Sequence, residues 1–186
     1  LVLEVGLGGR LDAVNAIDAR CAIVTSVDID HVEYLGGTRD AIGREKAGIF
    51  RTGCAAVVAD PHPPQSLLDQ ARRVGARPLR IGIDFGFRAA GTQWSYWGPG
   101  GSRHGLAFPA LRGAVQLSNA SAAIAALDEM RGSLPLAVQH LRRGLADVGL
   151  AGRFQVLPGR PTVVLDVAHN PQAARVLAEN LAATVP

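Results

Sequence analysis

The chain of 186 residues lacks the features of secreted, membrane-spanning or disulfide-stabilised proteins. It has two cysteines, Cys21 and Cys54, which could form at most one disulfide bridge. No run approaches the roughly 18 consecutive apolar residues of a membrane span, and the first residues show no signal pattern. Because a chain of this size can bury a core without a disulfide, we expect a protein of the reducing cytoplasm.

An excess of one charge is also absent. The 19 basic and 16 acidic residues give a net charge of +3, and 48% of the residues are hydrophobic, as in ordinary soluble globular domains. The basic residues are scattered, so no segment resembles a nucleic-acid footprint. The small positive excess suits an anionic small molecule or a nucleotide, and we expect a monomer with neither a nucleic acid nor a membrane as partner.

Two residue types occur only once. The chain begins at Leu1 and its only methionine is Met130, so we expect a segment of a longer protein. Lys46 is the only lysine among 19 basic residues. Because nearly all other basic residues are arginine, the single lysine indicates that Lys46 has a role that needs an amine. The alternative is a solvated surface residue, which is usual for a lysine at this helical position.

Alternating strand and helix patterns predict an α/β fold with a mostly parallel sheet flanked by helices. Strands are expected at 1–5, where a buried strand ends, and at 22–27 and 54–58; helices are expected at 38–49 and 65–74. After residue 81, apolar residues alternate at period two between glycine-rich turns, which predicts antiparallel ribbons. Helices at 118–130 and 135–148 follow, then a strand at 162–167 and a last helix from 171.

The Pro/Gly cluster at 158–161 indicates a domain boundary. We expect residues 1–152 to form part of one domain and residues 153–186 to contain a hinge and the first strand and helix of a second.

Polar residues follow several predicted strands, where open α/β sheets bind ligands. Glu4 lies in an apolar run and is either part of a site or paired with an arginine such as Arg10. His31 is a metal ligand, a base or an ordinary loop residue. Asn119 and Asn170 are in positions typical of helix caps. No G-x-x-x-x-G-K-[ST] phosphate loop is present.

Five motifs occur in one order along the chain: E-V-G-L-G-G-R-L-D-A at 4–13, D-H at 30–31, R-E-K-A-G-I-F at 44–50, G-R-F at 152–154 and L-D-V-A-H-N-P at 165–171. Together they resemble the folylpolyglutamate synthase and dihydrofolate synthase family of the Mur ligase superfamily. The resemblance implies the central ATPase domain of a Mur ligase without its phosphate loop, plus the first βα unit of a Rossmann-like C-terminal domain.

The resemblance also implies roles for single residues. It makes Glu4 and His31 ligands of Mg²⁺ and makes Lys46 a carbamylated, catalytic lysine, which would explain why this position is not arginine. The substrate-binding residues it implies are Leu11, Asp12 and Ala13.

For ATP, the resemblance implies contacts from Asn119, Arg153 and Asp166, with Arg153 also catalytic. One departure is Val14, where relatives often have threonine.

The implied reaction is the ATP-dependent joining of L-glutamate to the carboxylate of folate or dihydropteroate through an acyl phosphate. The alternatives are another Mur-type amino-acid ligase and a non-catalytic nucleotide-binding relative. Because the phosphate loop is absent and the apolar residues of the last strand and helix have no complete partner, we expect the chain alone to be inactive and poorly soluble. Those residues are Val163, Leu165, Val167, Leu177 and Leu181.

Overall fold

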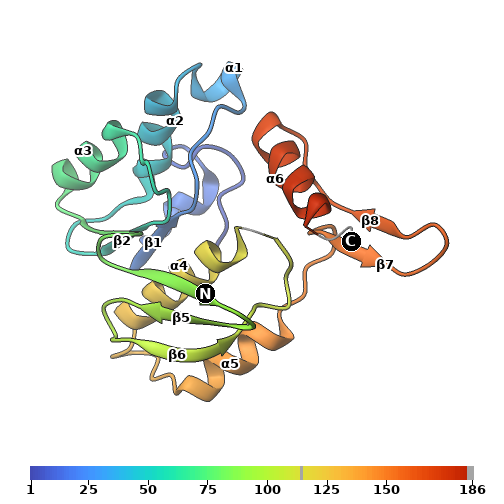
Figure 1. Cartoon of the computed structure of the whole chain (residues 1–186). Coiled ribbons are helices and arrows are strands. Elements are labelled where there is room, and N and C mark those ends of the chain that lie inside the picture. Colours follow the sequence, from blue (N-terminus) through green and yellow to red (C-terminus); the bar gives the residue numbers. More distant parts are fainter. Residues whose placement is uncertain (114, 184–186) are drawn as a thin grey trace.

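A computed structural model describes residues 1–113 and 115–183. Its centre is a parallel sheet of three strands in the order β1-β2-β3, formed by Cys21–Val24, Ala55–Val58 and Arg77–Arg80. Helices cover both faces of this sheet (Figure 1). The parallel α/β arrangement predicted from the sequence is confirmed.

The strand residues alternate between the two faces of the sheet, as the period of two requires. Ala56 and Val58 of β2 pack with Ile42 and Leu67 from α2 (Arg39–Lys46) and α3 (Gln65–Val74). Val57 faces the opposite side, against α4 (Gln116–Glu129). The four residues of β2 are therefore buried on both faces.

Local signals explain where the helices begin and end. The Thr38 hydroxyl accepts a hydrogen bond from Ala41 N and caps α2. Gly75 ends α3 in the left-handed conformation at φ 69°. A short helix, α1, spans Val32–Leu35, and 3₁₀ turns span Ala13–Ala16 and Ala47–Ile49.

An antiparallel sheet follows the parallel one, as predicted. Its strands are β4 (Gly86–Ala90), β5 (Gln93–Trp97) and β6 (Arg103–Ala107). Trp94, Tyr96 and Leu106 are buried in the same core as the inner side of α4. α5 spans Val138–Asp147 and packs against β6.

Asn119 does not cap a helix. α4 begins at Gln116, two residues earlier than expected, with Val115 as its N-cap, so Asn119 lies at the end of the first turn. Its side-chain Nδ2 instead lies 3.4 Å from Gln116 Oε1.

The C-terminal unit has one strand more than expected. β7 (Gln155–Leu157) pairs antiparallel with β8 (Val163–Leu165), and α6 spans Pro171–Ala182. Asn170 caps α6, as predicted, by accepting a hydrogen bond of 2.8 Å from Ala173 N. Figure 1 shows this unit extending beside the main body. Val163, Leu165, Val167 and Leu181 are exposed as expected, whereas Leu177 is half-buried.

The strand predicted at 1–5 is wrong. These residues form no strand, and Leu1 and Val2 are fully or almost fully exposed. β1 pairs with β2 on one side only, and no described strand lies along its other edge. Without a partner to take up its backbone hydrogen bonds, an apolar run does not form a strand.

Cys21 and Cys54 are both free and half-buried. Within residues 1–113 and 115–183, none of the helices has the length and apolar character needed to cross a membrane.

Candidate functional site

The glycine-rich turn at 6–9 is held in place by Asp12. Its Oδ2 accepts hydrogen bonds from Gly6 N at 2.9 Å and Leu7 N at 3.0 Å, and Oδ1 accepts one from Val14 N at 3.0 Å. The backbone donors of Leu7 and Val14 lower the pKa of the Asp12 carboxyl. The ionised Asp12 carboxylate thus holds the backbone of this turn in place. Its neighbour Leu11 is largely exposed.

The same turn packs closely on the end of α2. Arg10 N donates to Glu45 O at 2.9 Å, and Arg10 Nε lies 3.0 Å from Glu45 Oε1. A side chain at Gly48 would meet the Arg10 Cβ at 2.5 Å, so only glycine fits there. Arg10 thus pairs with Glu45, and no ion pair between Arg10 and Glu4 is found in the part of the chain that the structure describes.

The loop after β1 holds Asp30 and His31 in a constrained geometry. His31 has a φ of 48°, in the left-handed region that few residues other than glycine adopt. Its backbone N donates to Asp30 Oδ1 at 2.8 Å. The opposite carboxylate oxygen, Oδ2, accepts a hydrogen bond of 2.8 Å from Asn170 Nδ2. Asn170 is the main reason that the pKa of Asp30 is lowered.

Asp30, His31 and His169 form a group of three potential metal ligands. One ligand atom from each lies within 4.8 Å of the other two. Glu4 is not one of the three, and its assignment with His31 as a magnesium pair stays a prediction. His169, to which the sequence assigned no role, joins the site through the C-terminal unit.

Lys46, the last residue of α2, is half-buried rather than fully solvated. Burial lowers the pKa of its amine, and the nearby Asp30 carboxylate opposes this shift only in part. An amine with a lowered pKa is unprotonated more often, and the unprotonated form is the nucleophile.

A buried carboxylate, Asp60, holds the start of the loop that follows β1 and carries His31. It follows β2 and accepts hydrogen bonds from Val27 N at 2.9 Å, His62 N at 2.8 Å and Arg39 Nη2 at 2.9 Å. Arg39 Nε also donates to Val27 O at 2.7 Å. Neither Arg39 nor Asp60 was predicted as a site residue, because the sequence signals Asp60 only as an aspartate directly after a buried strand and gives no signal for Arg39.

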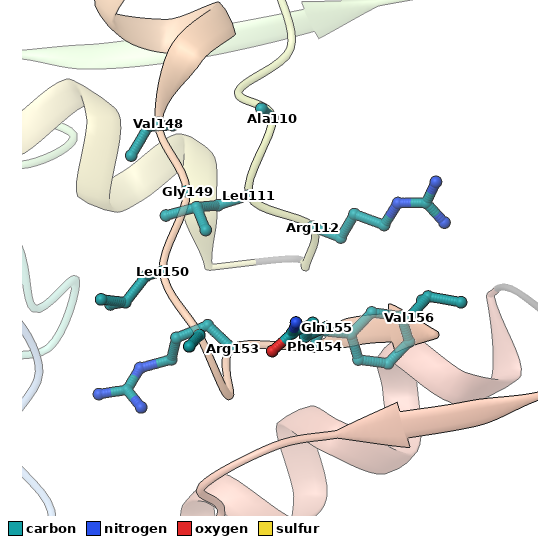
Figure 2. Close-up of a pocket in the computed structure, with 11 residues that line it drawn as sticks. Ala110, Leu111, Arg112, Val148, Gly149, Leu150, Arg153, Phe154, Gln155 and Val156 are labelled. Carbon is teal, nitrogen blue, oxygen red and sulfur yellow. The ribbon is translucent and has the colours of Figure 1, made fainter. Parts of the chain in front are cut away.

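Two clefts lie where the main body meets the C-terminal unit. The first has a volume of about 360 Å³ between residues 110–112 and 148–156. Figure 2 shows the side chains of Arg112 and Arg153 pointing away from each other across this cleft. The second has a volume of about 260 Å³ and is lined by Arg153, Asp166 and His169, with Gln116 at the start of α4.

The second cleft brings two of the predicted ATP-binding residues together. Arg153 and Asp166 both line it, and Asn119 contacts the lining residue Gln116. Asp166 accepts hydrogen bonds of 2.8 Å from Phe154 N and Ala168 N. Asp166 thereby connects the hinge residue Phe154, at φ 45°, with the segment before α6.

Comparison with known proteins finds no matching family model. Curated relatives named dihydrofolate synthase/folylpolyglutamate synthase are 38% identical in Haemophilus influenzae, over 98% of this chain and 44% of that protein, and 42% identical in Escherichia coli, over 95% and 40%. The E. coli structure in complex with DHPP and ADP has a TM-score of 0.91 at 40% identity, over 98% of this chain and 42% of that one. The Yersinia pestis structure with AMPPNP and Mn ion has a TM-score of 0.86 at 44% identity, over 96% and 42%.

The parallel sheet, the motif loops at its edge and these structures define an α/β protein of the Mur ligase fold. Within that class, the chain belongs to the dihydrofolate synthase/folylpolyglutamate synthase family. It spans about two fifths of the length of these curated relatives, which match it over 44% and 40% of their own sequences.

Proposed function

We propose that this chain is part of an ATP-dependent ligase that adds L-glutamate to a carboxylate of folate or dihydropteroate. In this reaction the substrate carboxylate attacks the γ-phosphate of ATP to give an acyl phosphate and ADP. The glutamate amine then attacks the acyl carbon, forms the amide and releases phosphate. The observation that carries the proposal is the 42% identity to the E. coli enzyme across 95% of the chain.

The two parts of the chain have separate roles in this proposal. Residues 1–152 belong to the central ATP-binding domain, and residues 153–186 contain the hinge and the start of the glutamate-ligase domain. The second cleft supports this division, because its lining comes from the start of α4 on one side and from α6 on the other. ATP bound between the two parts would bring them together for catalysis.

The loop residues fit a divalent metal ion. His31 offers an imidazole nitrogen beside the Asp30 carboxylate, and Glu4 would add a second carboxylate. Lys46, if carbamylated, becomes a further carboxylate, and its lowered pKa favours the reaction of its amine with CO₂. Magnesium bound here would neutralise charge on the ATP phosphates. The Mn ion in the Y. pestis structure supports a divalent metal in this family.

For the nucleotide, we assign Arg153 and Asp166 to the phosphate and ribose side of the cleft and Asn119 to the adenine. Arg153 is exposed at the hinge, where its guanidinium would stabilise the negative charge that develops during phosphoryl transfer. For the folate substrate, Leu11 and Ala13 are exposed and available for contact. Asp12 would contribute to substrate binding indirectly, because its carboxylate holds the conformation of the glycine-rich turn.

The direct test uses a full-length protein that carries this chain. With Mg-ATP, L-glutamate and dihydropteroate or tetrahydrofolate, we expect ADP release that depends on both substrates, and a product one glutamate heavier by mass spectrometry. Turnover with a cell-wall nucleotide precursor instead would identify another Mur-type amino-acid ligase. Calorimetric binding of Mg-ATP without any turnover would identify a nucleotide-binding relative.

The setting of the proposed enzyme is the cytoplasm, where ATP and reduced folates are available, and the proposed state is a monomer without nucleic acid or membrane partners. The two free, half-buried cysteines agree with a reducing compartment. Size-exclusion chromatography with light scattering tests the monomer, since a dimer would elute at twice the mass.

A further inference from the structure

We infer that Arg51 and Asn15 are positioning residues for the folate-type substrate, because they hold the turn at 11–17 on the segment that follows α2. The inference rests on the proposed function, in which residues 11–13 contact that substrate. Neither Arg51 nor Asn15 is one of those contacts, so both act through the turn. Their replacement should therefore weaken binding of the folate-type substrate and leave nucleotide binding unchanged.

The turn at 11–17 depends on support from outside. The structure describes all of its residues, and among them the regular structure is the 3₁₀ turn Ala13–Ala16, which buries none of its side chains. Leu11 and Ile17 are exposed as well. Hydrogen bonds in a 3₁₀ turn have poor geometry, and short helical segments are stabilised mainly by apolar packing. Because this turn has no such packing, polar contacts with other segments have to hold it.

The segment after α2 is a firm support. Ala47 and Phe50 are 0% and 3% exposed and lie in the core cluster on one face of the parallel sheet. Arg51 follows Phe50 directly, and its side chain is only 24% exposed. The Arg51 guanidinium is therefore attached to a fixed part of the backbone.

Arg51 connects this support to the turn through all three of its nitrogens. Nη2 donates to the carbonyl oxygen of Asn15 at 2.8 Å and to Asn15 Oδ1 at 2.9 Å. Nη1 donates to the carbonyls of Gly48 and Phe50, both at 3.2 Å, and Nε pairs with Asp18. The five N–H groups of the guanidinium thus have five acceptors, on both sides of the contact.

Asn15 completes the connection with its second side-chain atom. Nδ2 donates to the Arg10 carbonyl at 3.0 Å and to the Gly48 carbonyl at 3.2 Å. Asn15 therefore accepts from Arg51 through Oδ1 and donates across the same contact through Nδ2. An alanine at this position would leave both the guanidinium and two carbonyls without these partners.

Lysine cannot replace Arg51 in this arrangement. It keeps the positive charge, but it donates three N–H groups from one nitrogen and lacks the planar fork that reaches Asn15 and Gly48 together. With lysine the turn is ordered only when substrate binds, and this ordering reduces affinity. In the described part of the chain, no residue before Arg112 lines the second cleft, so nucleotide binding there should not change.

The experiment compares Arg51→Lys with the parent sequence in a full-length protein that carries this chain. Calorimetry measures the Kd of dihydropteroate in the presence of Mg-ADP, and the Kd of Mg-ADP alone, so no turnover is needed. We expect the Kd of dihydropteroate to rise by about 10-fold, the cost of ordering about one more residue. The Kd of Mg-ADP should change by less than about twofold, as for a distant independent site, which also shows that the variant is folded.

A second variant tests whether the two residues act together. Asn15→Ala should weaken dihydropteroate binding to a similar extent. The double variant should bind within about twofold of the weaker single variant, because both substitutions remove the same contact. Amide hydrogen exchange at 11–17 should be faster in each variant than in the parent protein.

Two control variants leave the connection intact. Arg72→Lys makes the same substitution on α3, where Arg72 pairs with the exposed Asp69. Asp18→Ala removes the acceptor of Arg51 Nε but not the contacts with Asn15. Both should bind dihydropteroate as the parent protein does.

The outcomes separate this inference from the proposed function. A parent protein that binds no dihydropteroate would refute the proposed function. If the parent protein binds it, an unchanged Kd in Arg51→Lys and Asn15→Ala would overturn the inference. A rise in the Kd of Mg-ADP that matches the rise for dihydropteroate would also overturn it, because the two residues would then only support the fold.

Discussion

Replacing Asp60 should destabilise the chain more than any exposed aspartate does. The Asp60 side chain is only 5% exposed, whereas its partner Arg39 is 40% exposed. In Asp60→Ala, the amides of Val27 and His62 lose their acceptor, and Arg39 Nη2 keeps only the His62 carbonyl. Breaking a buried pair costs about 3–5 kcal/mol, and the exposure of Arg39 places the expected loss near the lower end, at about 3 kcal/mol.

Asp60→Asn is the milder variant. An amide oxygen in the place of Oδ2 still accepts from Val27 N and Arg39, but the NH₂ group in the place of Oδ1 cannot accept from His62 N. We expect a loss of about 1–2 kcal/mol, in the range for one unsatisfied buried group. Because Arg39 and Asp60 together hold both the N–H and the carbonyl of Val27, the loop that carries His31 should become more mobile in Asp60→Ala than in Asp60→Asn.

The assay is urea unfolding of a full-length protein that carries this chain, at low micromolar concentration, followed by far-ultraviolet circular dichroism. With a slope of about 2 kcal/mol/M, the Asp60→Ala loss lowers the midpoint by about 1.5 M. The matched control is Asp69→Asn, which removes an exposed carboxylate paired with Arg72 on α3 and should cost less than about 1 kcal/mol. A midpoint for Asp60→Ala that equals the control midpoint would refute the reasoning.

The remaining predictions concern the core and the reaction. Asp128→Ala leaves the buried Arg103 without its ion-pair partner and should lower the free energy of unfolding by about 3–5 kcal/mol, measured by tryptophan fluorescence during urea unfolding. A loss below about 1 kcal/mol would contradict this prediction. In a full-length ligase, Lys46→Arg should abolish turnover although the charge is kept, and an active variant would reduce Lys46 to a structural residue. Glu4→Gln and His31→Ala should each reduce turnover strongly, and near-normal rates in both would remove the metal assignment.

Much of the fold follows from local signals in the sequence. Thr38, Gly75 and Asn170 mark helix ends by their own chemistry, so these boundaries were predictable from capping alone. The apolar run at 1–5 was not, because a strand needs a neighbour to pair with and periodicity does not show whether one is present. β7 was missed for a related reason: three residues beside a Pro/Gly cluster gain strand structure only by pairing with β8.

Only part of the candidate site, too, was predictable from the sequence. The motifs identified His31, Lys46 and Asp166 because their spacing resembles a known family. They could not reveal that Asn170 reaches Asp30, or that Asp60 holds the loop, because such contacts arise only when distant segments pack together. Those contacts depend on the tertiary arrangement of β1, β2 and α6.

The central claim is that the substrate carboxylate attacks ATP directly and becomes an acyl phosphate. The most direct measurement is isotope transfer in a full-length protein that carries this chain, with ¹⁸O in the reacting carboxylate of dihydropteroate or folate. The account predicts that each turnover with L-glutamate releases inorganic phosphate containing one ¹⁸O atom, together with the amide product. Amide formation that leaves the phosphate free of ¹⁸O would contradict it.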